Sequence, residues 1–204
     1  MNYRFAYRVG FHPWEDALDQ PRFVEGISEL FAREESGREP PYGAALDLGT
    51  GSGIWGVQLA KRGWQVTGVD LVEKALERAR NRVREEGVDM RLIQASVTDL
   101  VAADVGSNFR LVLDTGTFHG LNRAQREAMG REVSAVTADD ATVLVLAWKP
   151  RQRGPLPRGA SQSGIEEAFA GWATSDIGTS NFEAPKPIEL LLKPGEHWYR
   201  LRRH

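Results

Sequence analysis

Leu46-Asp47-Leu48-Gly49-Thr50-Gly51-Ser52-Gly53 is the stretch of sequence that decides the fold. It follows a short apolar run and precedes a segment of helical character that ends at Gly63. Glycines between a strand and a helix allow positive φ angles and let a ligand approach the backbone closely. Because open α/β sheets bind ligands where their parallel strands end, the stretch predicts a ligand site at the carboxyl edge of a sheet.

Strands and helices are predicted to alternate on both sides of this stretch. Apolar runs predict strands at 44–48, 65–69, 90–95, 109–113 and 141–148, and helical spacing predicts helices at 22–33, 54–62, 73–86, 123–136 and 164–170. Such alternation is typical of βαβ units with right-handed crossovers, which place helices on both faces of a parallel sheet.

The C-terminal part follows a different pattern. Residues 188–192 and 197–202 flank Lys193-Pro194-Gly195-Glu196, whose composition favours a turn, so they predict an antiparallel hairpin at the sheet edge. Residues 172–177 are a further candidate strand. The expected fold class is therefore α/β: a Rossmann-like, mostly parallel, seven-stranded sheet with helices on both faces and an antiparallel C-terminal hairpin.

Composition narrows the class of protein. The 204 residues suffice for one α/β domain, and a net charge of −2 gives no electrostatic reason to expect nucleic acid or an anionic membrane as partner. The chain has no cysteine, which excludes disulfides, cysteine-bound zinc and thiolate catalysis, and its four histidines are not paired at metal-ligand spacing. No apolar run approaches the ~20 residues of a membrane span. We expect a cytoplasmic enzyme without a metal.

Two cofactors compete for the glycine stretch. Gly51-Ser52-Gly53-Ile54-Trp55-Gly56 is formally a dinucleotide fingerprint, and Asp70 lies at the distance at which an acid holds ribose hydroxyls. The charge of Asp47 favours S-adenosylmethionine over a dinucleotide. A carboxylate there would repel the diphosphate of NAD, whereas S-adenosylmethionine carries a sulfonium and an amino group and no phosphate. An NAD(P)-dependent reductase stays the alternative.

The same residues carry a resemblance to a known family. Leu46-Asp47-Leu48-Gly49-Thr50-Gly51-Ser52-Gly53 resembles the first motif of class I S-adenosylmethionine-dependent methyltransferases, and Asp70 matches their second motif, whose acid binds both ribose hydroxyls. The resemblance covers about residues 44–150. It implies S-adenosyl-L-methionine as cofactor and a set of cofactor-binding residues: Asp47, Gly49, Thr50, Gly51, Gly53, Asp70, Leu71, Ser96, Val97, Asp114, Thr115 and Trp14.

One position in that set departs from the family pattern. In the family, residues after the third strand hold the adenine, and many members have an acid where Ser96 stands. Ser96 can still bind the adenine edge. The equally supported alternative is a loop in which Thr98 or Asp99 caps a helix.

The loop after the fourth strand points to the acceptor. Asp114-Thr115-Gly116-Thr117-Phe118-His119 resembles the corresponding loop of thiopurine-methyltransferase-like small-molecule enzymes. The resemblance places Asp114 and Thr115 near the donor, so Asp114 and His119 are the catalytic candidates. Phe118 would stack on an aromatic or sulfur-containing acceptor, and His119, with a pKa near neutrality, would take its proton. The alternative is that His119 is a packed or capping residue.

The remaining candidates lie near the two ends of the chain. Gly10-Phe11-His12-Pro13-Trp14-Glu15 resembles the N-terminal segment that closes the acceptor pocket in such relatives, so His12 and Trp14 are predicted substrate residues. Trp148 ends the fifth strand on the same rim. We expect a single domain, 1–204, with a lid segment (1–40), a donor-binding core (41–150) and a substrate loop with the C-terminal sheet edge (151–204).

Absent motifs narrow the acceptor further. DNA amino-methyltransferases carry an Asn/Asp-Pro-Pro-aromatic motif where this chain has Asp114-Thr115-Gly116-Thr117, and no basic stripe suggests a nucleic-acid groove. The expectation is methyl transfer to oxygen, sulfur or nitrogen of a small, aromatic or heterocyclic molecule, with no nucleic acid or membrane as partner. A non-catalytic S-adenosylmethionine-binding module is a further alternative. Monomer and homodimer are both left open.

Overall fold

The computed structural model describes residues 17–151, 158–182 and 195–203. In chain order, these residues form α2 (Pro21–Glu35), β1 (Gly43–Leu48), α3 (Ile54–Arg62), β2 (Trp64–Asp70), α4 (Glu73–Glu85), β3 (Met90–Gln94), β4 (Phe109–Asp114), the 3-10 helix η2 (Phe118–Gly120), α5 (Arg123–Val136), β5 (Thr137–Trp148), α6 (Gln162–Ala168), β6 (Trp172–Thr179) and β7 (Glu196–Arg203). All the elements predicted between 22 and 148 are found.

The described strands form one sheet in the order β3-β2-β1-β4-β5-β7-β6. The first five pair in parallel, and β7 runs antiparallel between β5 and β6. The predicted seven-stranded, mostly parallel sheet is confirmed. The predicted partner of residues 197–202 is corrected, because both edges of β7 are taken by β5 and β6. Residues 188–192 lie outside the described ranges.

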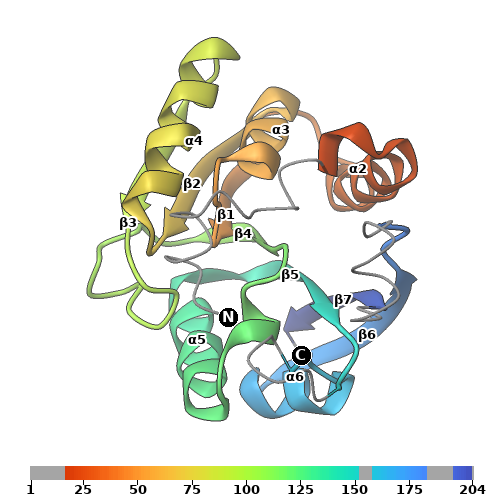
Figure 1. The fold of residues 1–204 in the computed structure, drawn as a ribbon. Helices are drawn as coiled ribbons and strands as arrows, with labels where there is room; N and C mark the ends of the chain where they lie inside the picture. The colour runs from red at the N-terminus through yellow and green to blue at the C-terminus, as the bar shows by residue number, and fades with distance from the viewer. Residues whose placement is uncertain (1–16, 152–157, 183–194, 204) are drawn as a thin grey trace.

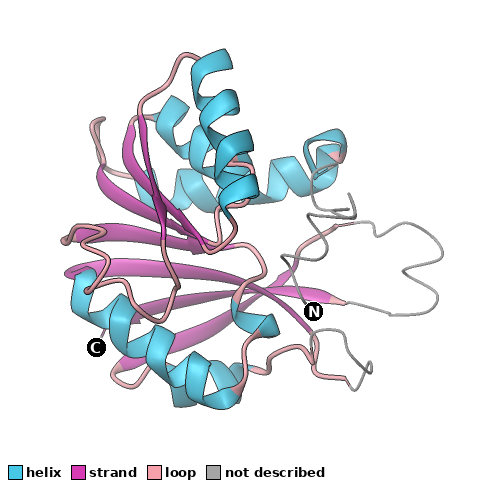
Figure 2. Ribbon diagram, turned by 60° about the vertical axis from the view of Figure 1, so that its left-hand side comes forward, coloured by secondary structure: helices cyan, strands magenta, loops and turns pink. Residues whose placement is uncertain are grey.

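Helices cover both faces of this sheet (Figures 1 and 2), as predicted. Helices α2, α3 and α4 lie on one face, and α5 and α6 lie on the other. Alternation of side chains along β1 separates two apolar clusters. Ala45 packs with α2 and α3, whereas Leu46 and Leu48 pack with α5. The carboxyl ends of the parallel strands therefore meet at one edge, between the two helical layers.

Strand β5 begins earlier than predicted. The sequence placed the strand at 141–148, but a bulge shifts the pairing from Phe109 with Thr137 to Leu111 with Thr142. The extra residues on β5 let the polar stretch 137–140 join the strand. An apolar pattern alone could not indicate this extension.

Two adjacent glutamates at the end of α2 hold that helix against the sheet. Glu35 accepts hydrogen bonds from Arg62 Nε (2.7 Å) and from Trp64 Nε1 (3.0 Å). Glu34 accepts from Arg200 Nε (2.7 Å), Arg200 Nη2 (2.8 Å) and Thr142 Oγ1 (2.8 Å). Glu34 therefore connects α2 to β5 and β7, which lie in the half of the strand order away from β3.

Candidate active site

The glycine turn takes the geometry that its sequence predicts. Gly49, Gly51 and Gly53 have φ angles of +65°, +56° and +78°, and Gly53 is the N-cap of α3. A Cβ added at Gly49 would lie 1.9 Å from Thr117 Oγ1, so a larger residue would collide with the loop after β4. The Thr50 amide donates to Val69 O (2.9 Å) and joins the turn to β2. The turn is thus held between the ends of β2 and β4.

Asp47 lies beneath this turn rather than on its surface. Its side chain is only 1% exposed, and its Oδ2 accepts a hydrogen bond from Thr50 Oγ1 (2.6 Å). Its Oδ1 is buried without a hydrogen-bond partner. Burial, with smaller contributions from Asp114 and Asp70, raises the pKa of Asp47 to about 7 against the opposing hydrogen bond from Thr50. Asp47 would therefore act on a ligand through its field, and its own ionisation responds to nearby charge.

Asp70, the predicted ribose-binding residue, lies at the end of β2 beside the glycine turn. Its Oδ2 accepts from the Gly51 amide (2.9 Å) and its Oδ1 from the Val72 amide (2.8 Å), which fixes the carboxylate between turn and strand end. Two ionised oxygens offer about four acceptor positions, so two are left for hydroxyl groups. Leu71 beside it is 50% exposed, which is unusual for a large apolar side chain and suits a flat ring.

Ser96 lies in the turn that follows β3. Its Oγ accepts from the Thr98 amide (3.2 Å) and is 2.7 Å from Thr98 Oγ1. Val97 is 7% exposed and belongs to the cluster under α5. Ser96 thus stabilises its own turn, and the helix cap considered at Thr98 or Asp99 is not found. Turns, and no helix, fill the described residues 95–108.

Asp114 organises the loop after β4. Its side chain is 0% exposed; Oδ1 accepts from the amides of Gly116 (2.8 Å) and Thr117 (2.6 Å), and Oδ2 from the amide of Phe118 (2.8 Å). Burial raises the pKa of Asp114 to about 6 against these three amides. The Asp114 carboxylate, which was expected at the cleft, therefore accepts its hydrogen bonds from the amides of its own loop. Thr115 and Thr117 of this loop are half-buried.

Phe118 also differs from its predicted place. It is 0% exposed in the cluster under α5, and its ring centroid lies 5.9 Å from that of Phe169. A side chain in the core has no face left for an acceptor, so the stacking role expected for Phe118 has no support in the geometry. The cause is Asp114, because its bond to the Phe118 amide turns the loop inward.

His119 of η2 and Trp148 at the end of β5 lie together, and His119 is only 6% exposed, which fits the alternative that it is a packed residue. Their rings stack at 5.0 Å between centroids, and the Trp148 amide donates to His119 Nδ1 (3.3 Å). Trp148 Nε1 donates to Glu196 Oε1 (2.9 Å), and Ser180 Oγ donates to Glu196 Oε2 (3.0 Å). Glu196 and Ser180 were not predicted, since neither belongs to a motif; Glu196 begins β7 and Ser180 follows β6.

Arg126 is a second group that the sequence did not single out. From α5, its Nε donates to Phe118 O (3.2 Å) and its Nη2 donates to His119 O (3.1 Å) and Gly159 O (2.7 Å). Its Cζ lies 4.9 Å from the centroid of the Phe118 ring. Burial lowers the pKa of Arg126. The guanidinium thus joins the loop after β4 to the chain after β5.

Asp176 and His197 form a pair on the two strands that lie beyond β5 in the sheet. Asp176 Oδ2 is 3.0 Å from His197 Nδ1, and the two residues come from β6 and β7. Nothing in the sequence brings positions 176 and 197 together before the strand register is known. His12, Trp14 and residues 152–157 of the predicted substrate loop lie outside the described residues.

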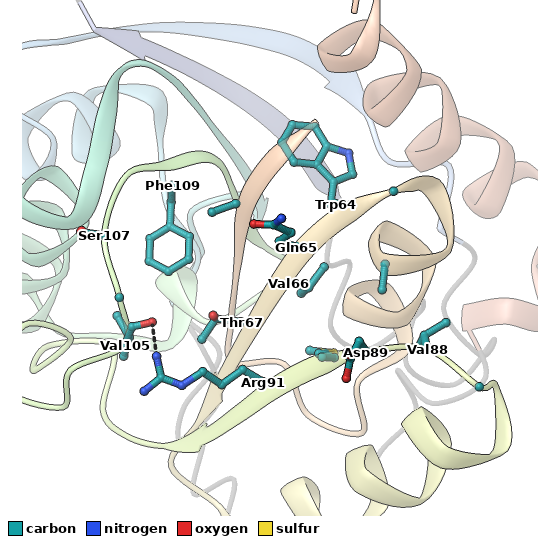
Figure 3. A pocket seen from close by; sticks show the side chains of 16 residues that line it. Trp64, Gln65, Val66, Thr67, Val88, Asp89, Arg91, Val105, Ser107 and Phe109 are labelled. Atoms are coloured by element: carbon teal, nitrogen blue, oxygen red, sulfur yellow. Dashed lines mark hydrogen bonds between the residues drawn. The ribbon is translucent and has the colours of Figure 1, made fainter. Parts of the chain in front are cut away.

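A pocket of ≈ 810 Å³ opens at the opposite edge of the sheet (Figure 3). Trp64, Gln65, Thr67, Arg91 and Phe109 are among the side chains that line it. They lie near the beginnings of β2, β3 and β4, whereas the glycine turn follows the end of β1. Because α/β sheets bind ligands at the carboxyl ends of their strands, this pocket is not the candidate site.

No helix among the described residues is long and apolar enough to cross a membrane. No group of three or more His, Cys, Asp or Glu side chains in residues 17–151, 158–182 and 195–203 could hold a metal ion.

Comparison with known sequences identifies the central part of the chain. Residues 45–140 match a family described as a methyltransferase domain. The ubiquinone biosynthesis O-methyltransferase of Xanthomonas axonopodis pv. citri (strain 306) is 34% identical over 95 residues, 46% of this chain and 40% of that protein. The human EEF1A lysine methyltransferase 2 is 29% identical over 100 residues, 48% of this chain and 42% of that protein. The chain thus spans about two fifths of the length of these relatives.

A solved structure extends the similarity to the whole fold. The 1,6-didemethyltoxoflavin-N1-methyltransferase of Burkholderia thailandensis, with bound 1,6-didemethyltoxoflavin and S-adenosylhomocysteine, superposes with a TM-score of 0.67. The superposition covers 99% of this chain and 85% of that one, at 20% identity. At such identity the similarity establishes the Rossmann-like methyltransferase fold.

Proposed function

Residues 45–140 are a class I S-adenosylmethionine-dependent methyltransferase domain, and from this premise we propose that the chain transfers a methyl group from S-adenosylmethionine to a small molecule. The observation that carries the proposal is Asp70, fixed by the Gly51 amide and only half-buried beside the exposed Leu71. The glycine turn receives the methionine part, Asp70 the ribose hydroxyls, and Leu71 with Ser96 and Val97 the adenine.

Electrostatics supports this donor over a dinucleotide. Asp47, Asp70 and Asp114 surround the turn, and the fields of Asp114 and Asp70 both act on Asp47. A cationic sulfonium nucleoside is attracted by these carboxylates, whereas a diphosphate is repelled, and the effect is strong where water is scarce. Gly49, Thr50 and Gly53 shape the turn without adding charge. We therefore rank an NAD(P)-dependent reductase below a methyltransferase.

The acceptor is proposed to lie over the ends of β4 and β5. Thr115, His119 and Trp148 form that rim, and His12 and Trp14 of the lid segment would close it, within a single domain. Because His119 Nδ1 accepts a main-chain amide, its neutral ring carries its proton on Nε2. His119 is thus proposed to donate a hydrogen bond to the acceptor rather than to take its proton. Asp114 acts by positioning this loop.

We also propose that the loop after β4 contacts the acceptor, as the corresponding loop does in thiopurine-methyltransferase-like enzymes. Alignment of the acceptor atom with the methyl carbon at about 3 Å supplies most of the rate, since the sulfonium is already activated. A rim formed by a tryptophan and a histidine, with no basic stripe in the sequence, favours a flat, uncharged or weakly acidic molecule over nucleic acid.

Isotope transfer tests the proposal directly. The chain is incubated with methyl-labelled S-adenosylmethionine and a panel of thiols, phenols, hydroxyquinolines and a lysine-containing peptide. Label on one of the small molecules is the expected result. Label on the peptide alone would show that the acceptor is a peptide and not a small molecule. Donor binding without transfer to any compound would indicate a non-catalytic binding module. Binding of NAD in place of the donor would overturn the assignment.

A further inference from the structure

Thr117 connects the loop after β4 to the strand that leads into the glycine turn. Its Oγ1 donates a hydrogen bond to the main-chain oxygen of Leu48 (3.3 Å), the last residue of β1, although the two residues lie 69 positions apart in the chain. The parallel pairing of Leu48 with Asp114 brings these two strand ends together. The hydroxyl of Thr117 therefore joins the proposed donor site to the loop proposed to contact the acceptor.

The side chain of Thr117 also packs directly against the turn. A Cβ added at Gly49 would lie 1.9 Å from Thr117 Oγ1 and 3.2 Å from Thr117 Cβ, so the threonine occupies the space that a side chain at position 49 would need. Close-packed groups transmit a displacement to their neighbours. A shift of the glycine turn would therefore move Thr117, and a shift of Thr117 would move the turn.

The main chain of Thr117 is held from the other side. Its amide donates to Asp114 Oδ1 (2.6 Å), and its carbonyl oxygen accepts from the Gly120 amide (3.0 Å). Thr117 thus takes part in hydrogen bonds through its hydroxyl, its amide and its carbonyl group. The position of η2 relative to the glycine turn is set through this one residue.

The hydroxyl of Thr117 is not used for local capping. Thr117 is the N-cap of η2, a position from which a threonine side chain usually accepts a hydrogen bond from an amide of its own helix. Here no side-chain capping bond forms, and the hydroxyl donates to Leu48 of β1 instead. The role of the hydroxyl is therefore to hold η2 at a set distance from the turn rather than to start the helix.

We propose that Thr117 is a positioning residue, which holds the loop after β4 in register with the donor turn during methyl transfer. This inference rests on the proposed function, because the rate of methyl transfer depends on holding the acceptor atom in line with the methyl carbon. Thr117 acts through the backbone of the two segments it joins. Donor binding at the turn and order in the loop are then coupled, and such a coupling acts in both directions.

Two substitutions at position 117 test the hydroxyl. Valine keeps the shape of threonine without the hydroxyl, and serine keeps the hydroxyl. In single-turnover transfer to the small molecule that takes the label, Thr117→Val should be about tenfold slower than the wild type, and its Kd for S-adenosylhomocysteine should change by less than about twofold. Thr117→Ser should keep the rate within about twofold. Equal loss of rate in both variants, or a loss of donor affinity alone, would overturn the inference.

Thr137 supplies a matched control at the opposite edge of the sheet. Its Oγ1 donates to the main-chain oxygen of Val133 (2.9 Å) where α5 meets the start of β5. Thr137→Val removes a comparable bond from a hydroxyl to a carbonyl group, and it should leave the rate of transfer within about twofold of the wild type. The same loss of rate in Thr137→Val and Thr117→Val would show a general loss of stability and would overturn the positioning role.

Hydrogen exchange tests the coupling without an acceptor. Binding of S-adenosylhomocysteine should slow exchange of the amides of residues 116–118 in the wild type, and most of this protection should be lost in Thr117→Val but kept in Thr137→Val. Equal protection in the wild type and Thr117→Val would overturn this inference alone. Failure of the wild-type chain to bind S-adenosylhomocysteine would instead overturn the proposed function.

Discussion

The two ends of the sheet form their proposed sites by different means. On the β1–β3 side, the glycine turn and Asp70 lie within a few dozen positions and interact through main-chain amides. On the β5–β7 side, the rim is formed by side chains from separate elements, among them His119, Trp148 and Glu196. A ligand recognised through backbone geometry leaves a compact sequence motif, whereas a ligand recognised by gathered side chains leaves none.

The comparison predicts first that stability depends on the attachment of β5 and β7 to α2. Glu34→Ala leaves Arg200 without its partner, and loss of one member of a largely buried ion pair should lower the free energy of unfolding by about 3 kcal/mol. Urea denaturation measures this change. The exposed pair of Arg123 with Glu127 is the control, and Glu127→Ala should leave the free energy of unfolding nearly unchanged. Similar losses for both variants would contradict the attachment.

Donor binding should depend on the other end of the sheet. Asp70→Ala removes a carboxylate that would accept two ribose hydroxyls, each charge-assisted bond contributing about 1.5 kcal/mol, so S-adenosylhomocysteine should bind about 10²-fold more weakly. Calorimetric titration measures the affinity. Asp89→Ala removes an exposed carboxylate at the opposite edge and should leave binding unchanged. Equal affinity of Asp70→Ala and the wild type would place the ribose elsewhere.

The buried carboxylate under the turn should make stability depend on pH. Since burial raises the pKa of Asp47 to about 7, the folded state holds a proton that the unfolded state loses near pH 4. The free energy of unfolding should therefore fall as pH rises from about 4 to about 7, and Asp47→Asn should reduce that fall by on the order of 2 kcal/mol. Asp114, with a pKa raised to about 6, accounts for a remaining slope.

Denaturation at several pH values checks this prediction. An unchanged slope in Asp47→Asn would show that Asp47 is ionised throughout. Because a cationic donor favours the ionised carboxylate, S-adenosylmethionine should gain affinity over the neutral-sulfur S-adenosylhomocysteine as pH rises through about 7.

The smallest expected effect concerns Leu71. Its side chain is 50% exposed, so Leu71→Ala should leave stability unchanged and weaken S-adenosylhomocysteine binding by about fivefold, the equivalent of about 1 kcal/mol of lost apolar contact. Val101 is 57% exposed and lies after the proposed adenine turn, so Val101→Ala is the matched control. Equal effects of the two substitutions would remove Leu71 from the adenine site.

The sequence predicted the fold well where local pattern and topology agree. Strands β1 to β5 and their helices follow apolar periodicity, and the glycines at 49, 51 and 53 have the positive φ angles expected of them. The antiparallel C-terminal pairing was predicted, but its partner strands were not, because turn chemistry at 193–196 indicates where a chain reverses and not which strand it meets. The register that inserts β7 between β5 and β6 depends on packing of the whole sheet.

The candidate site was predictable in its donor part and only partly in its acceptor part. Asp70 and the turn can be placed from spacing, because a strand end and a helix start determine where they lie. Asp114 and Phe118 were expected at the cleft, but a carboxylate after a strand can equally accept the amides of its own loop. Arg126 and Glu196 carry no local signal, since their partners come from distant strands and loops.

One titration tests the central claim most directly: calorimetry of the wild-type chain against S-adenosylhomocysteine and, separately, against NAD. The carboxylates around the glycine turn predict saturable binding of one S-adenosylhomocysteine per chain and no heat of binding with NAD. Binding of NAD, with none for S-adenosylhomocysteine, would contradict the account.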